Sequence, residues 1–312
     1  MQTREKLVKL QAKANSIFLG KQKVIHLATL SLICQGHLLI EDRPGVGKTT
    51  LANMLAKLFG LKESRIQFTN DLLPADLIGS MIFEQKTGDF SFKHGPIFGN
   101  LIIADELNRA TPKTQSAMLQ CMEERSISID GENYPLPSPF IVMATQNPFQ
   151  FIGTFELPES QIDRFFMGLI IDYPQREAEK EILLAKQNPR EILPQLESMI
   201  NKEELQLLKQ ALGNIAVAAT LVDYILDIID ASRNRAAGLF PADCLPLSVR
   251  AGLDLSMAAR AQAYLNDRNY VIPDDIQFVA PAILGHRIAG NKGIAYGVQI
   301  VEEALKKIAI KV

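Results

Sequence analysis

Residues 41–50 read Glu-Asp-Arg-Pro-Gly-Val-Gly-Lys-Thr-Thr, and they lie between the apolar run 38–40 and a helical pattern that begins at Leu51. Glycines let a backbone curl so that successive N–H groups point at phosphate oxygens, and a helix that begins near Lys48 adds the positive end of its dipole. Lys48 would supply a charge for the β- and γ-phosphates, and Thr49 a hydroxyl for magnesium. The segment therefore predicts a phosphate-binding loop in a nucleotide-binding protein. The residues expected to hold the phosphates are Pro44, Gly45, Val46, Gly47, Lys48, Thr49 and Thr50.

The strict pattern of such loops, G-x-x-x-x-G-K-[ST], would place a glycine at position 42, where this chain has Asp42. The remainder of the motif is intact, and a strand and a helix flank it in the expected order. A glycine-rich turn without a ligand is the alternative interpretation. That alternative does not explain a lysine and a threonine at the start of the helix, so we retain the phosphate-loop interpretation.

Charge and cysteine content argue against several classes of protein. Lys and Arg number 33 against 35 for Asp and Glu, so the formal net charge of -2 gives no overall positive field for nucleic acid or acidic lipid. Cys34, Cys121 and Cys244 are far apart and form no C-x-x-C pair, which favours reduced thiols and argues against structural zinc. No apolar run approaches the ~20 residues that a membrane helix needs. We therefore expect a cytoplasmic protein with no membrane span.

The order of apolar patterns along the chain predicts two domains. Up to about residue 172, strand-like runs alternate with helical patterns, which is typical of a mainly parallel sheet covered by helices. After Tyr173 the pattern becomes helical. We therefore expect an α/β nucleotide-binding core at residues 1–175 and an all-α domain at residues 176–312. The expected strands cover residues 37–41, 65–68, 101–104, 140–145 and 166–171, and the expected later helices cover 177–186, 202–212, 221–233, 248–266 and a segment from about 273.

Two hairpin-like segments interrupt the alternation, at residues 81–92 and 126–138, the second around the turn pair Asp130 and Gly131. Both are predicted to be insertions outside the core of the sheet. Ordinary surface hairpins are one interpretation. Projections that contact a substrate or a neighbouring molecule are the other.

A buried strand at residues 101–104 leads directly into two acids, Asp105 and Glu106. Because the carboxyl ends of parallel strands lie on the ligand side of such a sheet, both carboxylates should face the phosphates. Asp105 is expected to hold the magnesium shell together with Thr49, and Glu106 to orient or deprotonate the attacking water. These residues predict hydrolysis in addition to binding.

The strand at residues 140–145 is followed by Gln146, Asn147 and Pro148. The amide of Asn147 could reach the water or the γ-phosphate without adding charge. An asparagine before a proline also favours the start of a turn, so both interpretations stay open at this point.

Together these segments resemble the MoxR family of AAA+ ATPases. The resemblance rests on the phosphate loop and on residues 105–110 (Asp-Glu-Leu-Asn-Arg-Ala), 144–148 (Ala-Thr-Gln-Asn-Pro) and 157–165 (Leu-Pro-Glu-Ser-Gln-Ile-Asp-Arg-Phe). It covers most of residues 17–172 and, more thinly, the helical part through Arg287. The resemblance implies an AAA+ phosphate-loop sheet with two hairpin insertions, followed by a small all-α lid. It also implies that ATP and Mg²⁺ bind between sheet and lid, and that the chain assembles into a ring, usually a hexamer.

The resemblance also implies roles for individual residues. Asn147 falls at the sensor 1 position, and Arg164 at the arginine finger that enters the next subunit's site, although Arg164 taken alone would fit a surface ion pair. Arg250 falls on the sensor 2 helix, where Val249 replaces the family's usual proline. From that helix it would contact the γ-phosphate. The segment that begins the family's adenine site contains Phe18 and ends near Ile25, and either residue would fit plain core equally well.

By resemblance, the function is ATP-driven remodelling or maturation of a protein complex, with a protein client and an adaptor that carries a von Willebrand factor A domain. An AAA+ motor acting on nucleic acid is a second hypothesis, disfavoured by the slightly acidic charge and by the lack of a basic, aromatic-rich segment. A third is a nucleotide-dependent binding switch. Such switches usually lose the carboxylate that activates water, whereas Glu106 is present here.

Overall fold

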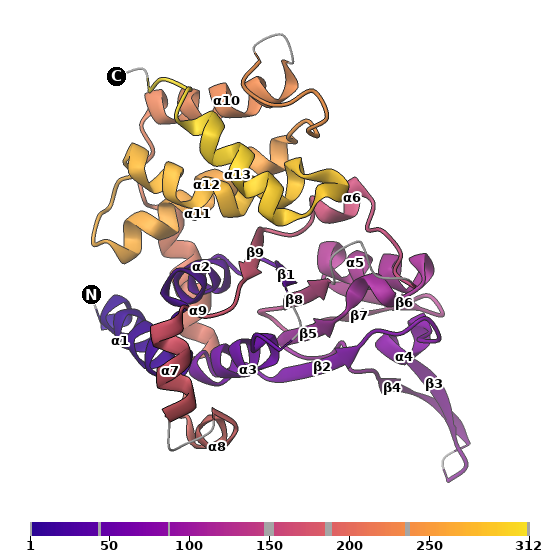
Figure 1. The fold of residues 1–312 in the computed structure, drawn as a ribbon. Coiled ribbons are helices and arrows are strands. Elements are labelled where there is room, and N and C mark those ends of the chain that lie inside the picture. Colours follow the sequence, from indigo (N-terminus) through magenta and orange to yellow (C-terminus); the bar gives the residue numbers. More distant parts are fainter. Residues whose placement is uncertain are drawn as a thin grey trace.

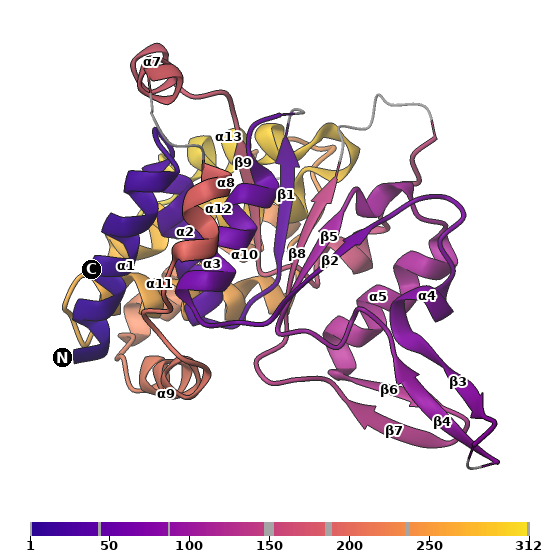
Figure 2. The ribbon, with the colours of Figure 1, turned by 90° about the horizontal axis from the view of Figure 1, so that it is seen from below.

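The computed structural model describes residues 2–42, 45–86, 88–146, 153–184, 189–234 and 238–310. At its centre is one sheet of five parallel strands in the order β2-β5-β8-β1-β9 (Figure 2). The predicted parallel sheet is therefore confirmed, and each expected strand has a counterpart. The strands are β1 (Leu38–Asp42), β2 (Glu63–Gln67), β5 (Leu101–Asp105), β8 (Ile141–Gln146) and β9 (Met167–Ile171).

Both faces of the sheet are covered, so its central strands are apolar throughout rather than alternating. Successive residues point to opposite faces: Ile103 joins the buried cluster under one layer of helices, and Ile102 joins the cluster under the other. The first layer contains α1 (Gln2–Ile17), α2 (Gln22–Ile33) and α3 (Lys48–Leu58). The second layer contains α4 (Pro74–Ile78) and α5 (Pro112–Glu124), and Thr111 is the N-cap of α5, with its side chain accepting a hydrogen bond from the N–H of Thr114.

The two predicted hairpins are present and lie outside the central sheet. One pairs β3 (Gly79–Glu84) with β4 (Asp89–His94), and the other pairs β6 (Ser126–Ile129) with β7 (Glu132–Pro135). The rings of Phe92 and Tyr134 lie 4.4 Å apart between centroids, so the hairpins contact each other. The β3–β4 hairpin projects furthest from the body of the molecule (Figure 1).

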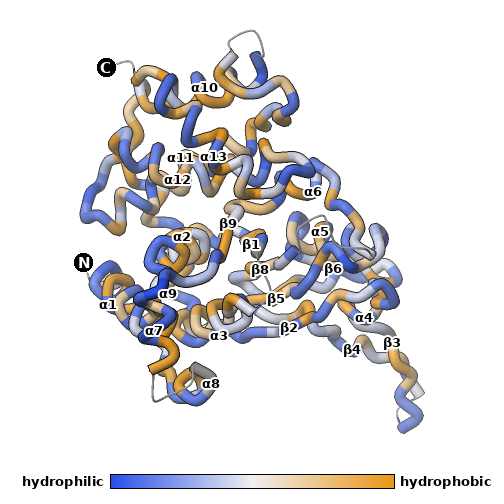
Figure 3. The backbone as a smooth tube through the Cα atoms, viewed as in Figure 1, coloured by the Kyte–Doolittle hydropathy of each residue, from blue (hydrophilic) through white to orange (hydrophobic). Residues whose placement is uncertain are grey.

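The second half of the chain is helical, as expected, and forms the lid seen beside the sheet in Figure 1. Figure 3 shows both apolar and polar residues along its longer helices, and apolar residues of these helices share one buried cluster with α1, α2 and α3. Among the described residues, no helix is both long and apolar enough to cross a membrane. The helices are α7 (Arg176–Leu184), α8 (Pro189–Ile192), α9 (Lys202–Gly213), α10 (Ala219–Arg233), α11 (Val249–Leu265), α12 (Pro273–Ile288) and α13 (Ile294–Leu305).

Candidate active site

The phosphate loop joins β1 to α3 through two glycines whose backbones are left-handed, with φ of 85° at Gly45 and 92° at Gly47. Gly47 is the N-cap of α3 and has no side chain to cap the N–H groups of the first turn, which suits a bound anion. A Cβ atom at Gly47 would lie 2.8 Å from the Phe18 ring. Phe18 therefore packs on the loop, whereas Ile25 is fully buried in the core. Pro44 lies outside the described residues.

The loop opens into a cavity of about 450 Å³ at the carboxyl ends of the central strands. The structure thus brings together, around one cavity, the described loop glycines, Lys48, Thr49 and both predicted acids. The volume of the cavity is in the range typical of small-ligand sites. The residues that line it are Gly45, Gly47, Lys48, Thr49, Thr50, Arg65, Gln67, Asp105, Glu106 and Thr145.

The two acids have different surroundings. The Asp105 side chain is 8% exposed, and its Oδ2 accepts a hydrogen bond from Nε of Arg65 at 2.6 Å. The Glu106 carboxylate accepts from Nε2 of Gln67 at 3.1 Å and lies 3.1 Å from Nε of Arg109. Each acid is therefore held by a side chain of β2, Arg65 for Asp105 and Gln67 for Glu106.

The backbone also orients Glu106. Its φ is 58°, an unusual left-handed conformation for a residue with a side chain, and its N–H donates to Oγ1 of Thr145 at 2.9 Å. This bond ties the end of β5 to the end of β8. Strained backbone of this kind is often found at functional sites, where the surrounding structure enforces it.

The cavity suits magnesium that arrives with a nucleotide. The described residues contain no group of three His, Cys, Asp or Glu side chains able to hold a metal ion by themselves. Mg²⁺ bound with nucleotides takes one or two protein ligands and completes its shell with phosphates and water. Thr49 and Asp105, both lining the cavity beside the loop, fit that limited set of ligands.

A third acid, Glu41 at the end of β1, links the cavity region to the lid. Its carboxylate accepts from the backbone N–H of Ile294 at 3.1 Å and from Nε2 of Gln146 at 3.0 Å. Burial raises the pKa of Glu41, and these two hydrogen bonds oppose that effect. The first residue of α13 is thereby attached to the strand that leads into the phosphate loop. Asn147, which follows Gln146, lies outside the described residues.

The two predicted arginines do not line the cavity at the phosphate loop. Arg164 lies 2.7 Å from one oxygen of Glu123, and Arg250 lies 3.2 Å from the other oxygen of the same carboxylate. Both line a second cavity of about 370 Å³, together with Arg125 and Lys209. Burial lowers the pKa of Lys209, and Arg125 adds to the effect. Arg164 and Arg250 thus form a pair on a surface with excess positive charge.

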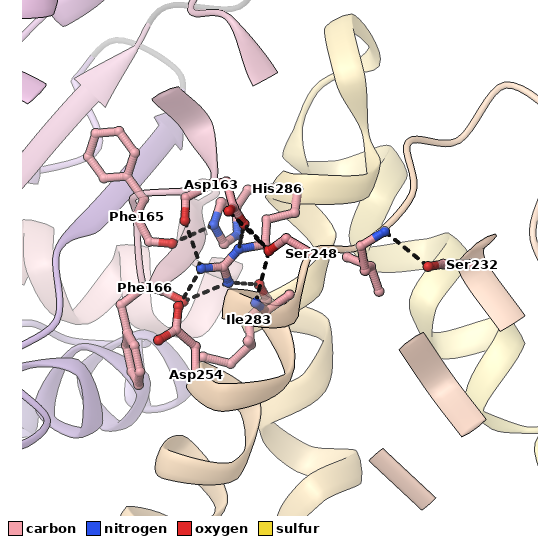
Figure 4. Close-up of polar contacts among 11 residues, drawn as sticks. Asp163, Phe165, Phe166, Ser232, Ser248, Asp254, Ile283 and His286 are labelled. Atoms are coloured by element: carbon pink, nitrogen blue, oxygen red, sulfur yellow. Dashed lines mark hydrogen bonds and ion pairs between the residues drawn. The ribbon is translucent and has the colours of Figure 1, made fainter. Parts of the chain in front are cut away.

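A network of ion pairs and hydrogen bonds around Arg287 lies next to this pair in the chain (Figure 4). Arg287 of α12, 3% exposed, donates to Oδ1 of Asp163 at 2.9 Å and pairs with Asp254 of α11. Ser248, the N-cap of α11, donates to the same Asp163 carboxylate at 2.9 Å. In the chain, Asp163 is next to Arg164, and Ser248 is close to Arg250. The network therefore connects the chain segments that carry the two arginines.

We expect Arg287→Met to destabilise the fold by about 3–5 kcal/mol, because it leaves two partly buried carboxylates without their cation. Chemical denaturation of the purified protein measures this change. Arg176→Met replaces an exposed arginine outside the network and should change the free energy of unfolding by less than about 0.5 kcal/mol. Equal stability of the two variants would show that the network does not hold the lid.

Several residues of the candidate site were not predicted from the sequence. Arg65 and Gln67 could have been suspected, because polar residues alternate with buried Ile66 on a strand that ends beside Asp105. Glu123 carried no such signal, because its contacts are with residues distant in the chain.

The comparison with family models agrees with this site. The model described as "ATPase family associated with various cellular activities (AAA)" matches residues 37–167, and a model of the AAA lid domain matches residues 245–304. The fold and the site define an AAA+ ATPase, an enzyme that binds a nucleotide and hydrolyses ATP.

Individual relatives identify the family within that class. Chaperone MoxR1 of Mycobacterium tuberculosis is 39% identical, across 87% of this chain and 72% of that protein. Protein MoxR of Paracoccus denitrificans is 31% identical, across 89% and 87%. A crystal structure from Cytophaga hutchinsonii superposes with a TM-score of 0.86 at 37% identity, across 99% of this chain and 96% of that one. The chain belongs to the MoxR family.

Proposed function

We propose that this protein hydrolyses ATP with magnesium at sites formed between copies of the chain, and that a ring of such copies remodels or matures protein complexes. One observation carries the proposal. The phosphate loop and the two acids line one cavity, whereas Arg164 and Arg250 line another with no residue in common. A site that needs both sets is complete only when a second copy supplies the arginines.

In the first copy, the loop N–H groups and Lys48 bind the β- and γ-phosphates. Thr49 and Asp105 hold the magnesium, which supplies charge neutralisation at the phosphates. Glu106, oriented by its bonds to Thr145 and Gln67, positions the attacking water and accepts its proton. Asn147 acts as sensor 1, the role that the family resemblance implies.

In the second copy, Arg164 and Arg250 face the γ-phosphate across the interface. Because Glu123 binds both guanidinium groups in the single chain, they enter the neighbour's site as a pair, and the phosphates replace Glu123 as their anion. A hexamer is the assembly we propose. The hydrogen bond between α13 and Glu41 connects the lid to the strand before the phosphate loop and supports a lid that responds to the nucleotide. The proposed boundary between the two domains lies near residue 175.

The chaperone-like role is supported by the relative named chaperone MoxR1. We propose a protein client, an adaptor with a von Willebrand factor A domain, and action in the cytoplasm. The paired hairpins, with exposed Phe83 and Phe90 on the projecting one, are the proposed contact with the client. The presence of Glu106 in the cavity disfavours a pure binding switch, and the formal net charge of -2 disfavours a nucleic-acid motor.

Lys48→Ala should weaken ATP binding about 10- to 100-fold, because it removes a charge-assisted bond of roughly 1.5–3 kcal/mol. Calorimetric titration with ATP and magnesium measures the affinity. Lys57→Ala, an exposed change in the last turn of the same helix α3, serves as the control and should leave the affinity unaltered. Equal ATP affinity in both variants would refute the assignment of the phosphate loop.

A further inference from the structure

Arg65 lies on β2, the edge strand of the sheet next to β5. The register pairs Gln67 with Asp105 and Arg65 with Ile103, so Arg65 lies diagonally across from the acid. Alternation along the strand turns buried Ile66 into the core and leaves Arg65 and Gln67 on the side of the cavity. The edge of the sheet therefore brings a fixed cation to the acid expected to hold magnesium.

The contact between Arg65 and Asp105 is short, and the two side chains differ in their exposure to solvent. Nε of Arg65 lies 2.6 Å from Oδ2 of Asp105, and the arginine side chain is 56% exposed against 8% for the aspartate. Arg65 also lines the phosphate cavity together with Lys48. Because Nε of Arg65 binds Oδ2 of Asp105, the guanidinium is held at the edge of the phosphate cavity.

A carboxylate in a phosphate cavity creates an electrostatic conflict. A triphosphate that enters without magnesium meets a like charge at Asp105, and like charges a few ångströms apart in a partly buried cavity repel each other. Magnesium removes the conflict when it is bound. Arg65 neutralises the same carboxylate in the absence of the metal.

We propose that Arg65 is a positioning residue that acts as the counter-cation of Asp105, holding this acid in place and neutralised until magnesium reaches the site. The inference rests on the proposed function, because it assumes that the cavity binds a nucleotide. It assigns Arg65 a task that Lys48 and the finger arginine do not perform. Arg65 determines how strongly nucleotide binding depends on the metal.

The test measures the affinity for ATP twice, by calorimetric titration in excess EDTA and in excess magnesium. In Arg65→Met, the dissociation constant in EDTA should rise about tenfold, while the constant in magnesium should change by less than about twofold, because the metal replaces the missing cation. The ratio of the two constants therefore rises about fivefold or more. Arg65→Lys keeps a positive charge and should restore most of the affinity in EDTA.

Two further variants make the test specific. Glu63→Gln alters an exposed residue on the same side of the same strand and should leave the ratio at the wild-type value. Combined with Asp105→Asn, which removes the carboxylate charge, Arg65→Met should lose most of its effect in EDTA. A ratio that stays at the wild-type value in Arg65→Met would overturn the proposal, whether both constants rise together or neither changes. Failure of the wild-type protein to bind ATP in magnesium would instead refute the proposed function.

Discussion

Arg164→Ala is expected to lower the turnover of ATP by about 10³- to 10⁵-fold, the usual contribution of an arginine finger. This corresponds to roughly 4–7 kcal/mol of transition-state stabilisation. The affinity of a single chain for ATP should stay within about twofold, because Arg164 lines a cavity separate from the phosphate loop of its own chain. Steady-state hydrolysis and calorimetric titration measure the two quantities.

Arg176→Ala, which removes an exposed arginine on α7, is the matched control and should leave both quantities unchanged. Stability must be compared as well, since Arg164 is half-buried and paired with Glu123. A large loss of ATP affinity in isolated Arg164→Ala chains would place the arginine in its own chain's site. Unchanged turnover would remove it from the mechanism.

Glu106→Gln is expected to lower turnover by about 10²- to 10⁴-fold while ATP still binds, because the amide keeps the shape of the side chain but cannot accept the proton of the water. The hydrogen bond to Thr145 is donated by the backbone N–H of Glu106, so it should persist in the variant. Single-turnover hydrolysis and ATP titration separate the chemical step from binding. The variant should also retain assembly in the presence of ATP.

The exposed change Glu63→Gln on β2 serves as the control for the loss of one carboxylate near the cavity. Wild-type turnover in Glu106→Gln would exclude Glu106 as the base. Among the described residues that line the cavity, it would leave Asp105 as the remaining acid for the chemistry.

The sheet and the phosphate cavity could be predicted because their signals are local. Strands buried on both faces, such as β5 and β8, are continuous apolar runs, and the glycines and Lys48 of the loop are adjacent in the chain. The helix α13 lies within the expected all-α domain, but its start was not predicted. It follows Gly293, and glycine is a residue type typical of loops. Gly293 has a φ of 87°, and the absence of a side chain there leaves room for the carboxylate of Glu41.

The pairing of the arginines could not be predicted from local patterns. Arg250 and Glu123 are 127 residues apart, and Arg287 and Asp163 are 124 apart. Only the packing of α11 and α12 on the segment before β9 brings them together. The contact of Arg65 with Asp105 could not be predicted either. A polar residue on an edge strand is usually solvated, and only the register of β2 with β5 brings Arg65 close to the acid.

The central claim is that ATP is hydrolysed at a site shared between two copies, and mixing two inactive variants tests it most directly. Arg164→Ala chains keep the phosphate loop and Glu106, and Lys48→Ala chains keep Arg164. In mixed assemblies, confirmed by co-purification of differently tagged chains, a Lys48→Ala chain should supply its arginine to an Arg164→Ala neighbour and restore part of the turnover. Turnover that remains at the level of the separate variants in confirmed mixtures would contradict the claim.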